Sequence, residues 1–217
     1  MTQPTTRMML DLFAGFGGQS EPFIHDQKWD ILRIDNNPLL SEVPRMRIQN
    51  IMAMDPSTMF PGIEPGYIEY VHASPPCHQF SLGFHAPKAV CARACHDLGQ
   101  VCDYHPKQGI EMVLKSKAII DALQPRFWSI ENVKGSIKHL RPILGDPVFI
   151  VGPYVYWGRF PPIQIDPAIV PNKSTKDKRH SPLRSNYRAL IPFVVADAFK
   201  TAIETQTRIN GRKTEWS

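Results

Sequence analysis

The sequence has no apolar run long enough to cross a membrane, and its first seven residues are polar rather than a secretory signal. Only four of the 217 residues are cysteine, which disfavours the disulfide framework of a secreted domain. Hydrophobic residues make up 42% and charged residues 21%, the balance of a globular protein. We therefore expect one cytoplasmic domain over residues 1–217, because this length suits one α/β domain better than two.

The sequence also lacks a Walker lysine and a plain G-x-G-x-x-G motif, which disfavours a phosphate cradle. It contains instead a glycine-rich turn at residues 11–18, DLFAGFGG, where missing Cβ atoms permit close approach of a ligand. Asp35 ends the next expected strand, where an acid can accept hydrogen bonds from a ribose diol. Together these features predict a nucleoside-bearing cofactor, and a purely structural glycine turn is the alternative.

Apolar strands alternate with turns and amphipathic helices along the chain. We expect strands at residues 8–13, 30–34, 68–73 and 127–130, and helices at residues 20–25, 108–123 and 188–205. This alternation predicts an α/β fold with a doubly wound, mostly parallel sheet. Ligands bind such sheets at the carboxyl ends of the strands. That edge should bring together the residues at or just past the strand ends, namely Asp11, Asp35, Cys77 and Glu131.

Two of these residues are candidates for catalysis. Cys77 follows two prolines at a strand end, and a charged His78 or a helix N-terminus would favour its nucleophilic thiolate. The alternative is a small buried hydrophobic residue. Glu131 ends an apolar strand, where a carboxylate is costly unless it binds a partner or takes a proton. Its alternative role is that of an ordinary acid capping a helix.

Residues 78–106 are expected to form an irregular insertion after Cys77. Within it, Cys91-x3-Cys95 and Cys102-x2-His105 have spacings that a tetrahedral zinc site could use, with His85 and His96 as spare ligands. The alternative is a set of reduced thiols without a metal, since the spacing matches no standard pair of C-x-x-C knuckles.

Positive charge is concentrated near the C-terminus. Residues 171–217 hold ten Lys and Arg against four Asp and Glu, whereas the whole chain has a net charge of +5. This asymmetry suggests a polyanionic partner, and a solvated basic surface is the alternative. A basic loop is expected at residues 171–187, and the candidate phosphate contacts in and beside it are Lys173, Lys176, Lys178, Arg179, Arg184 and Arg188.

Four motifs in order resemble the DNA cytosine-5 methyltransferase family: DLFAGFGG at 11–18, IDNNP at 34–38, ASPPCHQFS at 73–81 and IENV at 130–133. The resemblance is weaker at YWGRFP, residues 156–161, and at RALIP, residues 188–192. It implies a Rossmann-like fold of the S-adenosylmethionine-dependent methyltransferase type and methyl transfer to carbon five of cytosine in DNA. The same chemistry on RNA or a free cytosine nucleotide remains an alternative, as does an inactive nucleic-acid-binding relative.

The resemblance also implies a role for each matched residue. Cys77 matches the nucleophile that attacks carbon six of cytosine, and Glu131 matches the acid at ring nitrogen three. Arg159 matches one arginine of a Gln-x-Arg-x-Arg motif near the catalytic pocket. In the cofactor site, Asp35 matches the ribose ligand and Asn50-Ile51 the adenine contact. The whole implied cofactor set is Asp11, Phe13, Ala14, Gly15, Phe16, Gly17, Gly18, Asp35, Asn36, Asn50, Ile51 and Pro75.

The sequence departs from the family pattern in several places, among them the partial Gln-x-Arg-x-Arg motif at Arg159 and RALIP in place of the usual C-terminal motif. His78 stands where glutamine commonly follows the nucleophile, and Asn50 is neutral where an acid is usual. Only about residues 161–184 are available where full-length members carry a long target-recognition region. We therefore expect a compact, phage-like, monomeric enzyme in a bacterial or phage-infected cytoplasm. Residues 78–106 or the basic loop would then substitute for the recognition region.

Overall fold

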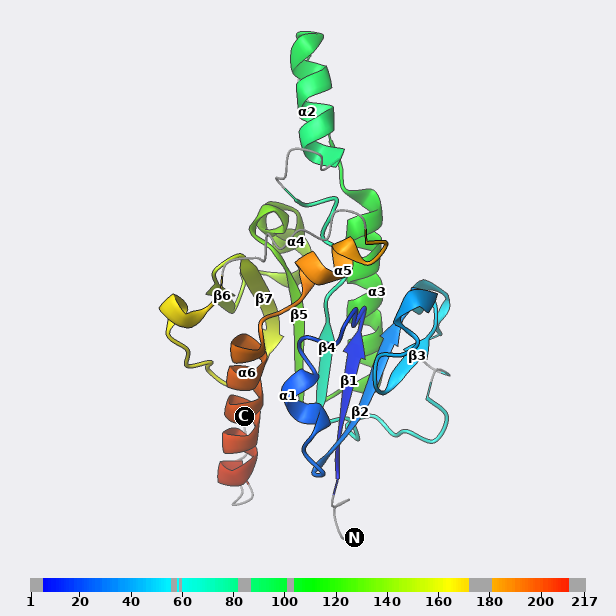
Figure 1. The fold of residues 1–217 in the computed structure, drawn as a ribbon, viewed down its shortest axis with the longest axis vertical. Helices are drawn as coiled ribbons and strands as arrows, with labels where there is room; N and C mark the ends of the chain where they lie inside the picture. Colours follow the sequence, from blue (N-terminus) through cyan, green and yellow to red (C-terminus); the bar gives the residue numbers. More distant parts are fainter. Residues whose placement is uncertain are drawn as a thin grey trace.

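A computed structural model describes residues 6–55, 58, 60–81, 87–100, 104–171 and 181–210. Within these residues, seven strands form one sheet in the order β3-β2-β1-β4-β5-β7-β6 (Figure 1). The strands are β1 (Arg7–Leu12), β2 (Trp29–Asp35), β3 (Met46–Ile48), β4 (Tyr70–Ala73), β5 (Phe127–Val133), β6 (Phe149–Val151) and β7 (Tyr154–Arg159).

The direction of the strands defines the fold. Strands β1 to β5 are parallel, whereas β7 is antiparallel to both β5 and β6. The strand order reverses between β1 and β4, and a doubly wound sheet binds its ligand outside the carboxyl ends at such a switch point. The predicted doubly wound, mostly parallel sheet of a Rossmann-like fold is therefore confirmed.

Helices cover both faces of the sheet, because alternate residues of each buried strand point to opposite sides. On one face, Met9 and Tyr70 pack with Phe199 of α6 (Phe193–Asn210), beside α1 (Glu21–Ile24). On the other face, Leu10 packs in a cluster with Ile120 of α3 (Lys107–Leu123). Helix α4 (Ile137–Leu144) extends this second layer through a smaller cluster over β7. Within the described residues, no helix is both long and apolar enough to traverse a bilayer.

Several elements differ from the expectation. Part of the segment expected to be irregular forms helix α2 (Pro87–Asp97), which extends away from the sheet in Figure 1. The single helix expected over residues 188–205 is divided into α5 (Arg184–Ala189) and α6, because Pro192 cannot continue a helix begun before it. Strand β5 runs on to Val133, so Glu131 lies inside the strand rather than at its end. Short 3-10 turns occupy Pro38–Leu40, Ile51–Ala53, Lys134–Ser136 and Pro167–Ile169.

Candidate functional site

A cavity of about 380 Å³ lies at the switch point of the sheet. Its volume falls in the range of sites for cofactors and other small molecules. Nine of the predicted site residues line it: Asp11, Phe13, Ala14, Gly15, Phe16, Gly18, Asp35, Asn36 and Cys77. The cavity thus joins the glycine-rich turn, the end of β2 and the loop that carries the thiol.

The glycines of the turn are required by its conformation and by close packing. Gly15 and Gly17 have φ angles of +54° and +77°, which side chains rarely adopt. A Cβ at Gly17 would collide with the Arg33 guanidinium, and one at Gly18 would lie 2.7 Å from the carbonyl oxygen of Ile191. The turn is therefore held between β2 and the segment that follows α5.

Asp35 fixes the turn against the end of β2. Its carboxylate accepts hydrogen bonds from the backbone N–H of Gly15 at 2.9 Å and of Asn37 at 3.0 Å. The residue is only 9% exposed, yet it lines the cavity. A carboxylate has about four lone-pair positions, so two remain for the hydroxyl groups of a ligand.

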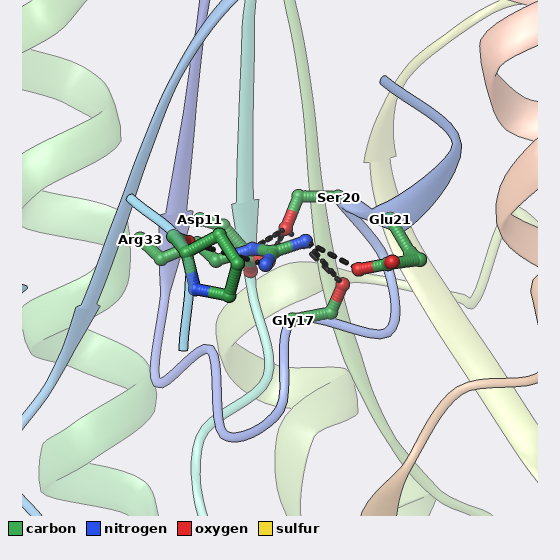
Figure 2. Close-up of polar contacts among 6 residues, drawn as sticks. Asp11, Gly17, Ser20, Glu21 and Arg33 are labelled. Carbon is green, nitrogen blue, oxygen red and sulfur yellow. Dashed lines mark hydrogen bonds and ion pairs between the residues drawn. The ribbon is translucent and has the colours of Figure 1, made fainter. Parts of the chain in front are cut away.

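A network of polar contacts around the buried Arg33 ties the turn to β1 and β2 (Figure 2). The Arg33 side chain is 1% exposed and donates to Ser20 Oγ at 2.8 Å and to Glu21 Oε2 at 2.8 Å. It also donates to the carbonyl oxygen of Gly17. Ser20 in turn donates to Asp11 Oδ2 at 2.6 Å. Sequence reasoning missed Arg33, because a basic residue in a short strand resembles an edge residue.

Asp11 makes the folded protein sensitive to pH. Burial raises its pKa from 3.8 to about 6, against the opposing effects of the Ser20 hydrogen bond and the Arg33 charge. Between these values the folded chain holds a proton that the unfolded chain has released. The stability that Asp11 contributes is therefore greatest below pH 3.8 and decreases as the pH rises to about 6. The loss is roughly 3 kcal/mol at 1.36 kcal/mol per pKa unit.

Urea unfolding of the wild type and Asp11→Asn at about pH 4 and pH 7 measures this loss. The wild type should lose stability relative to the variant as the pH rises, because the amide does not ionise. An equal pH dependence in both proteins would contradict a raised pKa at Asp11.

The loop that carries Cys77 is anchored on two sides. Asn132 Nδ2 donates to the carbonyl oxygen of Pro75 at 3.1 Å, which ties the loop to β5. Gln79 Oε1 accepts from the backbone N–H of Gly109 at 2.7 Å, in the first turn of α3, and Phe80 is fully buried. These anchors hold the thiol at the cavity. No sequence pattern indicated that Gln79 would bond to the first turn of α3.

Glu131 is hydrogen-bonded to a residue that lines the cavity. It is 5% exposed, and its Oε2 accepts from Ser74 Oγ at 2.6 Å. Ser74 itself lines the cavity, next to the loop that carries Cys77. One serine therefore connects a buried carboxyl group to the cavity that Cys77 also lines.

Some predicted residues lie away from the cavity lining. Asn50 caps a 3-10 turn by accepting from the backbone N–H of Met52, and Ile51 is buried in the core. Pro75 is buried, whereas Pro76 lines the cavity. Gly17 packs against Arg33 and is not one of the described residues that line the cavity. The adenine contact implied for Asn50 and Ile51 therefore stays a prediction.

Arg159 lies at the opposite end of the sheet from Cys77. Because β7 runs antiparallel to β5, its last residue pairs with Trp128 at the start of β5. The Arg159 guanidinium donates to the carbonyl oxygen of Pro125 at 2.6 Å. The structure thus does not bring Arg159 to the cavity, contrary to the expected location near the catalytic pocket.

Helix α5 borders the cavity, which sequence reasoning did not anticipate. Its Ser185, Asn186 and Ala189 line the cavity, and the Tyr187 ring lies 4.5 Å from that of Phe16. Arg184 and Arg188 are exposed on the same helix. The other candidate phosphate contacts, Lys173, Lys176, Lys178 and Arg179, lie outside the described residues.

The zinc prediction finds no support. Cys91 and Cys95 lie one turn apart on α2 with their sulfur atoms 3.9 Å apart, whereas Cys102 and His85 lie outside the described residues. His96 is exposed on α2, and His105 lies in the segment before α3. In the part of the chain that the structure describes, no three His, Cys, Asp or Glu side chains form a metal-binding group.

Comparison with protein-family models and with curated proteins finds no match. Among solved structures, 29 chains are similar to this one, and three of them are as follows. A protein described as a DNA modification methyltransferase encoded within an E. coli prophage has 17% identity and a TM-score of 0.45, over 77% of this chain and 51% of its own. The Entamoeba histolytica methyltransferase EhMeth has 15% identity and a TM-score of 0.47, over 74% and 55%. A SAM-dependent methyltransferase from Aquifex aeolicus has 11% identity and a TM-score of 0.38, over 71% and 84%.

The chain thus spans about half the length of the first two similar structures. All three identities lie below 25% and all three TM-scores below 0.5. A likeness of this degree assigns neither an activity nor a substrate to this chain.

Proposed function

We propose that this protein transfers a methyl group from S-adenosylmethionine to carbon five of cytosine in DNA, through a covalent adduct with Cys77. One observation carries the proposal: a single cavity is lined by the glycine-rich turn, by Asp35 and by Cys77, with Glu131 joined to it through Ser74. A nucleoside site and a nucleophile thus share one space.

The residues of the cavity suit the cofactor. Asp35 has lone pairs left to accept from the ribose hydroxyls, and Phe13 and Phe16 offer apolar surface. Asp11 supplies a buried carboxylate for the ammonium group of the amino-acid tail. When bound, S-adenosylmethionine supplies a methyl group on a positively charged sulfur atom, which an electron-rich carbon can accept.

Cys77 and Glu131 make carbon five of cytosine electron-rich. The Cys77 thiolate forms a bond to carbon six while Glu131 gives a proton to ring nitrogen three. Carbon five then takes the methyl group as the bond from this group to the sulfonium sulfur breaks, which leaves S-adenosylhomocysteine. The carbon-five proton is lost to solvent, and the bond between sulfur and carbon six is then cleaved. The thiolate of Cys77 is restored, and ring nitrogen three returns its proton to Glu131.

Charge at the rim of the cavity favours a nucleic acid over a free nucleotide. Arg184 and Arg188 are exposed on α5, the helix whose Ser185 and Asn186 line the cavity. Cations in this position can bind the phosphates that flank a base held in the cavity. A cytosine in duplex DNA reaches Cys77 only after it has been flipped out of the stack.

Covalent trapping tests this function. Duplex DNA containing 5-fluorocytosine is incubated with the protein and S-adenosylmethionine, and the products are separated on a denaturing gel. Fluorine cannot leave carbon five as a cation, so the bond between sulfur and carbon six persists. We expect an adduct that mass spectrometry maps to Cys77, and no stable adduct with ordinary cytosine.

Single-stranded DNA, RNA and a free cytosine nucleotide, each with the fluorinated base, serve as comparison substrates. An adduct on RNA or the nucleotide alone would overturn the DNA assignment. Cofactor binding without an adduct on any substrate would identify an inactive nucleic-acid-binding relative, as would DNA binding that depends steeply on salt without turnover.

A further inference from the structure

A buried histidine among the residues that line the cavity has a ring nitrogen without a hydrogen-bond partner in the described part of the chain. His72 is fully buried in β4 and lines the cavity. It pairs in register with Asp11 on β1 and with Ser129 on β5. Its Nδ1 lies 2.8 Å from Ser129 Oγ, whereas its Nε2 has no hydrogen-bond partner among the described residues.

A chain of hydrogen bonds fixes the position of the proton on this ring. The Tyr156 hydroxyl donates to Gln19 Oε1, and Gln19 Nε2 donates to the Tyr70 hydroxyl oxygen. The remaining contact of that hydroxyl is Ser129 Oγ at 2.6 Å, so Tyr70 donates its hydrogen there. Ser129 must then donate its own hydrogen to His72 Nδ1.

The ring therefore carries an N–H donor that is buried beside the cavity lining and has no hydrogen-bond partner among the described residues. Because Nδ1 accepts a hydrogen bond, the single proton of the neutral imidazole is on Nε2. Burial lowers the pKa of His72 to about 3, so the ring is neutral at physiological pH. A buried donor without a partner destabilises the protein, and a ligand with an acceptor at this point would offset that cost.

The position of His72 identifies the part of the ligand that it faces. Asp35 at the end of β2 marks the ribose end, and Cys77 after β4 marks the reacting end. His72 lies two residues before Ser74 in the chain and is the cross-strand partner of Asp11. An N–H donor beside a carboxylate matches the carboxylate and the ammonium of an α-amino acid.

We propose that His72 determines specificity for the amino-acid tail of the cofactor, with its Nε2–H donating to the tail's α-carboxylate. This inference rests on the proposed function, because that function supplies the cofactor. It adds a group that distinguishes S-adenosyl amino acids from nucleosides without the amino-acid tail.

Two ligands and two variants test this role by calorimetry. S-adenosylhomocysteine carries the amino-acid tail and 5′-methylthioadenosine lacks it. His72→Phe removes the donor with little change in volume, and we expect its Kd for S-adenosylhomocysteine to rise about 10- to 100-fold. Its Kd for 5′-methylthioadenosine should stay within about twofold. His72→Gln, whose amide can reach the Nε2 position, should restore most of the affinity for S-adenosylhomocysteine.

His25→Phe is the matched control, because this exposed histidine follows α1 and does not line the cavity among the described residues. It should bind both ligands like the wild type. If His72→Phe lowers the affinity for both ligands equally, or leaves the affinity for S-adenosylhomocysteine unchanged, the role of His72 is overturned. The cofactor assignment would still stand in either case. A wild type that binds neither ligand would overturn the cofactor assignment and this inference with it.

Nitrogen-15 NMR of the unmodified protein tests the same role without a variant. With labelled histidine, the His72 ring should show the Nε2–H form at neutral pH. Its Nε2–H resonance should shift on addition of S-adenosylhomocysteine and stay in place on addition of 5′-methylthioadenosine. A ring protonated on Nδ1 instead would contradict the inference.

Discussion

Cys77→Ala is expected to lower the rate of methyl transfer to DNA by on the order of 10⁴-fold or more. The proposed reaction cannot begin without the bond from sulfur to carbon six. Cofactor affinity should change by less than about threefold, because truncating Cys77 leaves the hydrogen bonds of Asp35 and Asp11 intact. Methyl incorporation from labelled S-adenosylmethionine measures the first quantity, and calorimetry measures the second.

Cys95→Ala is the matched control for this prediction. Its thiol lies on α2, beside that of Cys91, and does not line the cavity among the residues described. The control should keep the wild-type rate within about twofold, as surface substitutions away from a site usually do. A Cys77→Ala variant that loses cofactor binding together with activity would mark Cys77 as structural. One that retains activity would exclude it as the nucleophile.

Arg33→Leu should lower the free energy of unfolding by about 1–3 kcal/mol, the cost of leaving a buried acceptor without its donor, because the ion-pair partner Glu21 is 45% exposed and can be solvated. Arg33 donates to Ser20, to Glu21 and to the carbonyl oxygen of Gly17, so the change leaves these acceptors without their donor. It also removes the positive charge that favours ionised Asp11. Urea unfolding at neutral pH measures the loss.

Arg141→Leu is the control, because Arg141 pairs with Asp146 while the two side chains are 61% and 77% exposed. Solvent screens such pairs, so its cost should stay below about 1 kcal/mol. If Arg33→Leu and Arg141→Leu lower the free energy of unfolding by the same amount, the contacts of Arg33 would not stabilise the fold in the way its burial indicates.

Local sequence patterns predicted the central part of the fold. The apolar runs that became β1, β2, β4 and β5 were placed to within a few residues. Other elements differed from the local pattern or were not predicted by it. Cysteine spacing in residues 78–106 suggested a metal-bound loop, yet the alanines at 89, 92 and 94 favour a helix, and α2 forms there. The strands β3, β6 and β7 and helix α4 were not anticipated.

The sequence by itself determined that the glycine-rich turn, Asp35 and Cys77 share one cavity. Each follows or ends a parallel strand, and parallel strands place their carboxyl ends at the same edge of the sheet. Only the tertiary structure decided the rest. The reversal of β7 moves Arg159 to the far end, the break before α6 brings α5 to the cavity, and pairing with β5 fixes the proton on His72. These outcomes depend on contacts between segments tens of residues apart or more, which no local pattern encodes.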